Sequence, residues 1–128
     1  MVAINFDKQF AGAVERGEKL QTVRRPRNRQ PIVTGTVLQL YTGQRTKSVR
    51  KLHDAVCIGT DAVEIDRDSL FVAGRYLDSD DREAFARADG FKDYARMVAW
   101  FSNKSSLPFE GRVIQWRLAE PGERFTSS

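Results

Sequence analysis

Cysteine and histidine are almost absent from this 128-residue chain, which holds one of each, Cys57 and His53. A single cysteine cannot form a disulfide within the chain, and one cysteine with one histidine does not provide the four ligands of a structural zinc site. We therefore expect Cys57 to be a small buried side chain and His53 to mark the start of a strand. We expect neither a metal site nor a cofactor.

Long apolar runs are absent as well. No run approaches the roughly 18 apolar residues that a membrane span needs. The first ten residues, MVAINFDKQF, contain neither a basic leader nor a long apolar centre, so we expect no secretory signal. With 41% hydrophobic and 30% charged residues, the composition is that of a globular protein. These absences predict one cytoplasmic domain with no membrane partner.

Acidic residues are scarce in the first half of the chain. Residues 1–60 hold four Asp or Glu against eleven Lys or Arg, whereas residues 61–128 hold thirteen acidic residues against ten basic ones. A basic half in a small domain predicts a positive face that attracts polyanions or phosphates. Arginines that are solvated separately around the surface are the alternative, and charge alone does not distinguish the two.

Hydrophobic patterns predict strands at six places, and one of them, 53–65, is either one long strand with a glycine bend or two strands. The six ranges are 3–6, 21–25, 36–41, 53–65, 69–77 and 109–118.

Three helices are expected between these strands. An early one starts at the capping residue Asp7 and turns a face with Phe10, Ala13 and Val14 inward. Two more form a late pair, in which Ser79 caps the first helix and the second has an apolar stripe of Tyr94, Met97, Val98 and Phe101.

Together these elements predict an α+β fold: a small, partly open β-barrel of five or six strands with one early helix and a late helical pair. Residues 1–118 are expected to form the single domain. Residues 119–128 are polar and are expected to be a disordered tail.

Five segments resemble, in their order and spacing, the ASCH superfamily of small barrels related to the PUA-like RNA-binding domains. The strongest likeness is to small bacterial and phage-type members, which have a G-x-K-x-x-T-x-R element after the first helix. That element is Gly17, Lys19, Thr22 and Arg24 here, and the likeness covers about residues 3–118. The segments are 17–24, 35–47, 85–91, 97–101 and 108–116.

The residues of this element can form a polar cleft. In an extended segment Thr22 and Arg24 share one face, while Gln21 projects to the other. Lys19 joins Thr22 only if the chain turns after Gly17. A desolvated lysine has a lowered pKa and can act as a base on a hydroxyl, and a guanidinium offers a planar fork to a phosphate or carbonyl.

The resemblance implies a specific chemistry for this cleft. Some bacterial ASCH proteins are amidohydrolases that deacetylate acetylcytidine with a lysine, a threonine and a glutamate. The lysine and threonine fall at Lys19 and Thr22, and the acid falls at Asp89, which is one methylene shorter than glutamate. Asp89 also has a structural interpretation, because Asp-Gly is an ordinary way to leave a helix.

A second basic segment follows the predicted strand 36–41. Cations beside an aromatic ring suit a nucleotide or single-stranded RNA, because the cations hold phosphate and the ring stacks on a base. A solvated hairpin loop is the alternative. The predicted ligand-binding residues are Arg24, Arg25, Tyr41, Arg45, Lys47 and Arg50.

Three functions follow, and the sequence favours the first slightly. The first is a module that binds single-stranded RNA or a modified nucleoside or nucleotide in the basic cleft. The second is an enzyme in the same cleft, either an amidohydrolase on an acetylated nucleoside or a metal-independent ribonuclease, with Lys19, Thr22 and Asp89 as its catalytic residues. A protein-interaction domain is the least supported, since no apolar patch stands out.

Overall fold

The computed structural model describes residues 1–125 and shows an α+β fold in which seven strands form one sheet. In chain order the elements are β1 (Val2–Phe6), α1 (Lys8–Glu15), β2 (Gln21–Arg24), β3 (Val37–Thr42), β4 (Arg50–Ile65), β5 (Leu70–Val72), β6 (Arg75–Tyr76), α2 (Ser79–Ala88), α3 (Tyr94–Lys104) and β7 (Phe109–Leu118).

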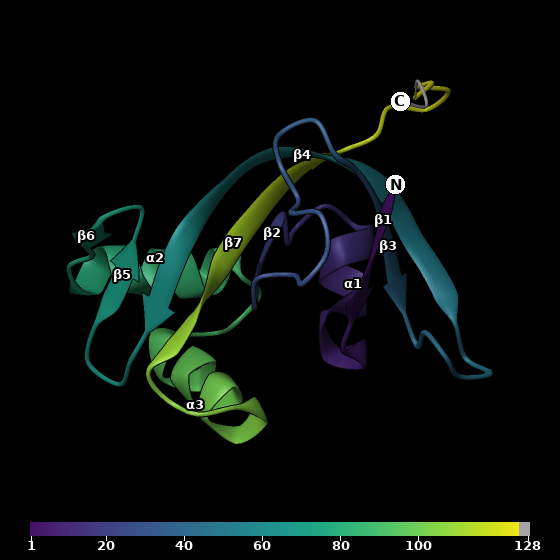
Figure 1. Cartoon of the computed structure of the whole chain (residues 1–128). Coiled ribbons are helices and arrows are strands. Elements are labelled where there is room, and N and C mark those ends of the chain that lie inside the picture. The colour runs from purple at the N-terminus through teal and green to yellow at the C-terminus, as the bar shows by residue number, and fades with distance from the viewer. Residues whose placement is uncertain (126–128) are drawn as a thin grey trace.

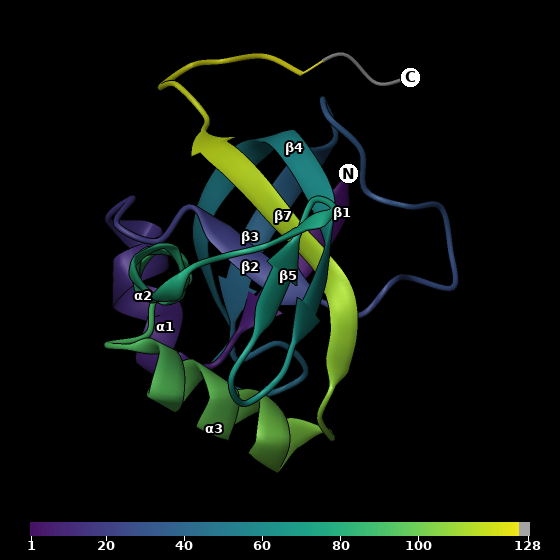
Figure 2. The same ribbon diagram turned by 90° about the vertical axis from the view of Figure 1, so that its left-hand side faces the viewer.

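Two long antiparallel strands, β4 and β7, form a curved arch over α1 and β2 (Figure 1). β4 pairs with β3 through its first half and with β7 from Ala55 to Ile65. β1 adds to β3 in parallel, and β2 adds to β7 in an antiparallel direction. The resulting strand order β1-β3-β4-β7-β2 curls into a half-barrel, as the second view also shows (Figure 2).

The half-barrel is open between its two edge strands, β1 and β2. No strand pairing joins these edges in the described part of the chain. A side chain bridges them instead: Arg24 on β2 donates a hydrogen bond from Nη2 to the carbonyl oxygen of Asn5 on β1, at 2.7 Å. The expected small, partly open β-barrel is therefore confirmed, and its opening lies beside Arg24.

β7 separates two hydrophobic cores. Ile114 and Trp116 belong to the core that contains α1, whereas Phe109 and Val113 belong to the core under α2 and α3. Val113 and Ile114 are adjacent and lie on opposite faces of the strand, as alternation predicts, and both are buried. Both faces of this strand are covered, so each face receives a core.

The helices follow the predicted pattern with one correction. Asp7 caps α1 by accepting the Gln9 N–H, and the four residues of the predicted α3 stripe are all buried. The cap of α2, however, is Asp78 and not Ser79: Asp78 Oδ1 accepts the Asp81 N–H at 2.8 Å. Asp and Ser are comparable caps, so composition did not distinguish two adjacent candidates.

The strand predictions need two corrections. The range 69–77 is a hairpin of β5 and β6, because Ala73 and Gly74 both have positive φ angles, 52° and 85°, which reverse the chain. The sheet therefore has seven strands, and five of them form the half-barrel, as the predicted barrel of five or six strands requires. The range 53–65 is one strand, but it begins at Arg50, three residues before His53, and bulges between Cys57 and Gly59.

Two further expectations concern the chain end and Cys57. Cys57 is buried, as predicted. Within the predicted tail, Glu123 forms an ion pair with Arg117 at 2.8 Å, and residues 126–128 lie outside the described part of the chain. No helix in the described residues has the length and apolar character to cross a membrane.

Replacing Gly111 by Ala tests the packing of β2 on β7. A Cβ atom at Gly111 would lie 2.5 Å from the Arg24 carbonyl oxygen, so the two strands would have to separate. We expect Gly111→Ala to lower the free energy of unfolding by about 1–3 kcal/mol, measured by urea unfolding.

Gly59 provides a matched control on the neighbouring strand. Its added Cβ atom would meet only the Gln115 side chain at 3.5 Å, an ordinary contact. We therefore expect Gly59→Ala to change the free energy of unfolding by less than about 0.5 kcal/mol. Equal effects of the two substitutions would contradict the close approach of β2 to β7.

Candidate functional site

Lys19 enters the interior because the chain turns sharply after α1. Gly17 has a φ of 78°, and the Lys19 N–H donates to the Ala13 carbonyl oxygen at 3.0 Å. This wrapping of the helix end directs the long side chain back under the sheet. The side chain of Lys19 is 2% exposed, which is rare for a lysine.

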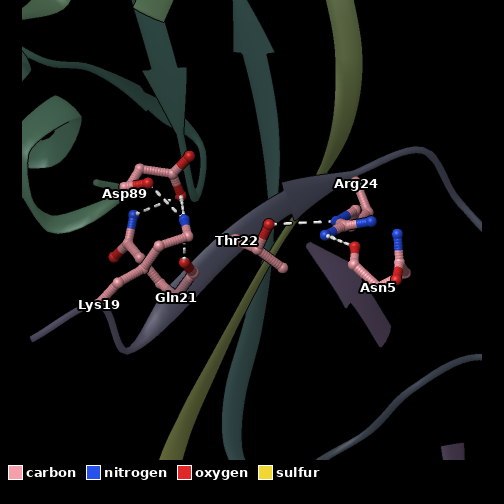
Figure 3. A network of polar contacts seen from close by, with 6 residues as sticks. All are labelled: Asn5, Lys19, Gln21, Thr22, Arg24 and Asp89. Atoms are coloured by element: carbon pink, nitrogen blue, oxygen red, sulfur yellow. Dashed lines mark hydrogen bonds and ion pairs between the residues drawn. The ribbon is translucent and has the colours of Figure 1, made fainter. Parts of the chain in front are cut away.

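The Lys19 ammonium connects β2 to the end of α2. Its Nζ atom donates to the Gln21 carbonyl oxygen at 2.7 Å and also to the Asp89 carbonyl oxygen. The Asp89 carboxylate lies 3.7 Å away and is itself 3% exposed. Gln21 Nε2 donates to the same carboxylate oxygen at 3.3 Å, so these three side chains form one buried polar group (Figure 3).

Aromatic rings and one glycine surround the ammonium. Lys19 Nζ lies 5.1 Å from the centre of the Phe10 ring and 5.8 Å from that of Phe6. Ring faces attract cations and partly replace the lost water. Gly90 has a φ of 96°, and a Cβ atom there would lie 2.9 Å from Lys19 Cδ. Glycine after Asp89 therefore serves both the turn and the passage of the lysine.

Burial moves the pKa values of the pair toward each other. Desolvation is the main cause for both groups: it lowers the pKa of Lys19 to about 8 and raises the pKa of Asp89 to about 6. The attraction between the two charges opposes both shifts without cancelling them. Both groups therefore exchange protons close to neutral pH.

Thr22 and Arg24 form a second polar group, next to the first. Arg24 Nε donates to Thr22 Oγ1 at 3.1 Å, and the guanidinium stacks 5.0 Å from the centre of the Phe6 ring. The bond from Arg24 to the Asn5 carbonyl oxygen fixes its far end. Burial lowers the pKa of this guanidinium, but an arginine stays charged at any working pH.

A cavity of about 150 Å³ brings the two groups together. Figure 3 shows Thr22 between the Lys19 group on one side and Arg24 with Asn5 on the other. No hydrogen bond joins the two groups within residues 1–125, and side chains of both groups line the cavity. The lining residues are Asn5, Phe6, Asp7, Phe10, Lys19, Thr22, Val23, Arg24, Asp89, Phe91, Trp100 and Phe101.

The other predicted ligand-binding residues do not line this cavity. Arg25 donates to the Ser105 hydroxyl, and its guanidinium lies 4.8 Å from the centre of the Phe109 ring. Tyr41 is half-buried on β3, and Arg45 and Lys47 are exposed in the loop that follows it. Arg50 forms an ion pair with Glu15 at 2.7 Å. The structure therefore divides the predicted residues into a buried set and a peripheral set.

Three residues of the site lie outside the predicted catalytic and ligand-binding sets. Gln21 projects away from Thr22, as expected, but its amide meets Asp89. Asn5 contributes a backbone carbonyl, which no sequence pattern reveals. Trp100 lies off the apolar stripe of α3 and packs edge to face on Phe10, with ring centres 5.2 Å apart, at the cavity wall. Only its departure from the stripe could have indicated this position.

The site has two buried charges, a hydroxyl and a fixed guanidinium around one small space. Such groups can hold a polar substrate atom, exchange a proton with it and stabilise negative charge that develops on it. No group of three or more His, Cys, Asp or Glu side chains in residues 1–125 could hold a metal ion.

Comparison with known proteins adds no relative. No protein-family model matches the chain, and no curated protein or solved structure is significantly similar to it. Membership of the ASCH superfamily stays a prediction from the sequence motif.

The pKa of Asp89 predicts a pH dependence of stability. The folded protein keeps the Asp89 proton up to pH about 6, whereas the unfolded chain loses it near 3.8. Stability from this group is therefore present below pH 3.8 and lost as the pH rises to about 6. We expect Asp89→Asn to remove this loss, measured by urea unfolding at several pH values. The control is Asp61→Asn, which removes an exposed carboxylate. A difference in the free energy of unfolding between Asp89→Asn and wild type that stays constant from pH 3.8 to about 6 would contradict the prediction.

Proposed function

We propose that the cavity is the active site of an amidohydrolase that removes the acyl group from an acetylated nucleoside of the acetylcytidine type. One observation supports this most: Lys19 and Asp89, both almost fully buried, face the same cavity as Thr22 and Arg24. The G-x-K-x-x-T-x-R motif supports the same chemistry through its resemblance to the ASCH superfamily. We also propose membership of that superfamily and a PUA-like barrel.

The reaction needs a nucleophile, a base, an acid and a site for negative charge. Lys19, as the neutral amine, takes a proton from the Thr22 hydroxyl or from a water that Thr22 orients, and the oxygen adds to the acetyl carbonyl carbon. Arg24 stabilises the oxyanion that forms. Asp89, as the neutral acid, gives a proton to the leaving nitrogen as the C–N bond breaks. If Thr22 is the nucleophile, water then hydrolyses its acetyl ester and releases acetate.

Burial favours an enzyme over a simple binding groove. A pair of charges buried this deeply usually contributes little net stability, because the desolvation cost offsets the attraction. A groove for a polyanion needs exposed cations, yet Lys19 and Thr22 are 2% and 5% exposed. Titratable groups shifted toward neutral pH and facing a cavity are typical of catalytic sites. The enzyme hypothesis therefore takes precedence for this cavity.

Activity on acetylcytidine tests the proposal directly. We expect Lys19→Met to lower kcat/KM at least about a hundredfold, because it removes the base. Thr22→Val should cause a comparable loss and Thr22→Ser a smaller one, since serine keeps the hydroxyl. Lys51→Met, which removes an exposed lysine paired with Asp54, is the control and should keep full activity. Chromatography of the products measures turnover, and wild-type turnover that survives Lys19→Met would contradict the proposal.

The same assay has an expected pH profile. The active form, neutral Lys19 with neutral Asp89, is the minor tautomer of the ammonium–carboxylate pair that predominates between the two pKa values, and both tautomers hold one proton. Activity should therefore be maximal between the two pKa values and fall below pH about 6 and above pH about 8. Asp89→Glu is the informative second variant, because it restores the acid found in the family that the motif resembles. A flat profile would contradict a role for the pair.

A second candidate function is binding of single-stranded RNA, and one contact favours it. The Gln44 N–H donates to Asn5 Oδ1 at 2.9 Å, and Asn5 lines the cavity. This contact holds the basic loop 43–49, with Arg45 and Lys47, next to the cavity. An RNA strand crossing that loop could place one base at the cavity, which is compatible with either binding or cleavage of the strand.

Salt dependence tests this second candidate. If Arg45 and Lys47 contact phosphates, the double variant Arg45→Gln, Lys47→Gln should weaken binding of a labelled single-stranded RNA and reduce the slope of log affinity against log salt by about 1–2. Fluorescence anisotropy measures the binding, and chromatography of the same RNA reports any cleavage. Arg75→Gln, an exposed arginine on β6, is the control. Equal slopes for the variant and the wild type would argue against RNA contacts at this loop.

A further inference from the structure

Four arginines line a second cavity, of about 80 Å³, which shares Arg24 with the first. It lies where β2 and the chain after it meet β4 and β7. Its apolar part consists of two prolines and two isoleucines, and Thr60 is its only other polar lining residue. The complete lining is Arg24, Arg25, Pro26, Arg27, Pro31, Ile32, Thr60, Arg112 and Ile114.

The sheet register places the backbones of two of these arginines opposite each other. Arg24 on β2 is directly opposite Arg112 on β7. Side chains opposite each other in an antiparallel pair share a face, and like charges there are destabilising. Within residues 1–125 no carboxylate lines this cavity, although the Asp89 charge in the first cavity attracts Arg24. In residues 1–125, none of the four arginines has an Asp or Glu oxygen within 4.0 Å.

Neutral groups hold three of the four guanidinium groups, those of Arg24, Arg25 and Arg112. Arg112 donates to Thr60 Oγ1 through Nη2 at 2.6 Å and through Nε at 3.2 Å. Arg25 donates to the Ser105 hydroxyl and stacks on Phe109. Hydroxyls and rings position an arginine without neutralising it. These three arginines are therefore held in position, each at its own neutral partners, and keep their positive charge.

We infer that this second cavity binds a phosphate group of the substrate, so that the substrate is a nucleotide or an oligonucleotide and not the free nucleoside. The inference rests on the proposed function, because it assumes that the nucleobase occupies the first cavity. Arg24 lines both cavities, so a base in the first and a phosphate in the second belong to one molecule of suitable size.

Phosphate fits this cluster better than a carboxylate does. A phosphate monoester carries up to two negative charges and has three terminal oxygens, enough to accept hydrogen bonds from several guanidinium forks at once. A single carboxylate has one charge and two oxygens, and so offers fewer acceptors to the four arginines. The apolar prolines and isoleucines provide a surface on which a sugar can pack.

Binding of reaction products tests the inference separately from catalysis. Cytidine and its 5′- and 3′-monophosphates lack the acetyl group, so their binding does not depend on turnover. We expect one monophosphate to bind wild-type protein at least about tenfold more tightly than cytidine, measured by calorimetry. Arg112→Gln and Arg27→Gln should each abolish most of this difference and leave cytidine binding unchanged. Arg75→Gln removes the same charge outside the cavity and should preserve the difference.

The outcomes separate this inference from the proposed function. Equal binding of cytidine and its monophosphates, or no binding of any of them, overturns the phosphate site. Turnover of acetylcytidine as fast as that of its monophosphates also overturns it and leaves the proposed hydrolase intact. A phosphate preference that disappears in Arg112→Gln, without turnover of any acetylated compound, supports the phosphate site and refutes the hydrolase. Comparing the binding of a trinucleotide with that of the monophosphates shows whether the site takes an internal phosphodiester or a terminal monoester.

Discussion

The antiparallel ladder between β4 and β7 is the constraint on which the other features of this protein depend. It holds ten residue pairs, from Ala55 and Leu118 to Ile65 and Phe109, and it curves into an arch. Within residues 1–125, β2 forms a ladder with β7 alone, so the segment that follows Lys19 is held by this arch. Because the two faces of β7 receive different cores, the space between those cores becomes available for a polar site.

The candidate site occupies that junction between the cores. Phe91 and Trp100 pack against both hydrophobic clusters and also line the cavity. A lysine and an aspartate at such a place lose most of their hydration, and their mutual attraction does not fully restore it. The protein therefore carries a destabilising pair where two apolar layers meet, and the proposed chemistry explains why such a pair is present.

Local pattern predicts well the parts of this fold that local physics decides. The stripe of Tyr94, Met97, Val98 and Phe101 indicates a buried helix face, because helical spacing alone aligns these side chains. The same reasoning places Thr22 and Arg24 on one face of a strand, where a hydrogen bond joins them. It fails where neighbouring residues compete, as with the cap of α2, and where two successive positive φ angles turn one expected strand into the β5–β6 hairpin.

The sequence by itself determined the alternation of strands and helices and the presence of a lysine, a threonine and an arginine within six residues. Tertiary structure alone decided that Asp89, seventy residues from Lys19 in the chain, lies beside it. It also decided that Arg24 faces Arg112 across a strand pair, while Arg45 and Lys47 stay outside the cavity. The physical reason is that strand register and desolvation involve residues distant in sequence, so no local pattern encodes either of them.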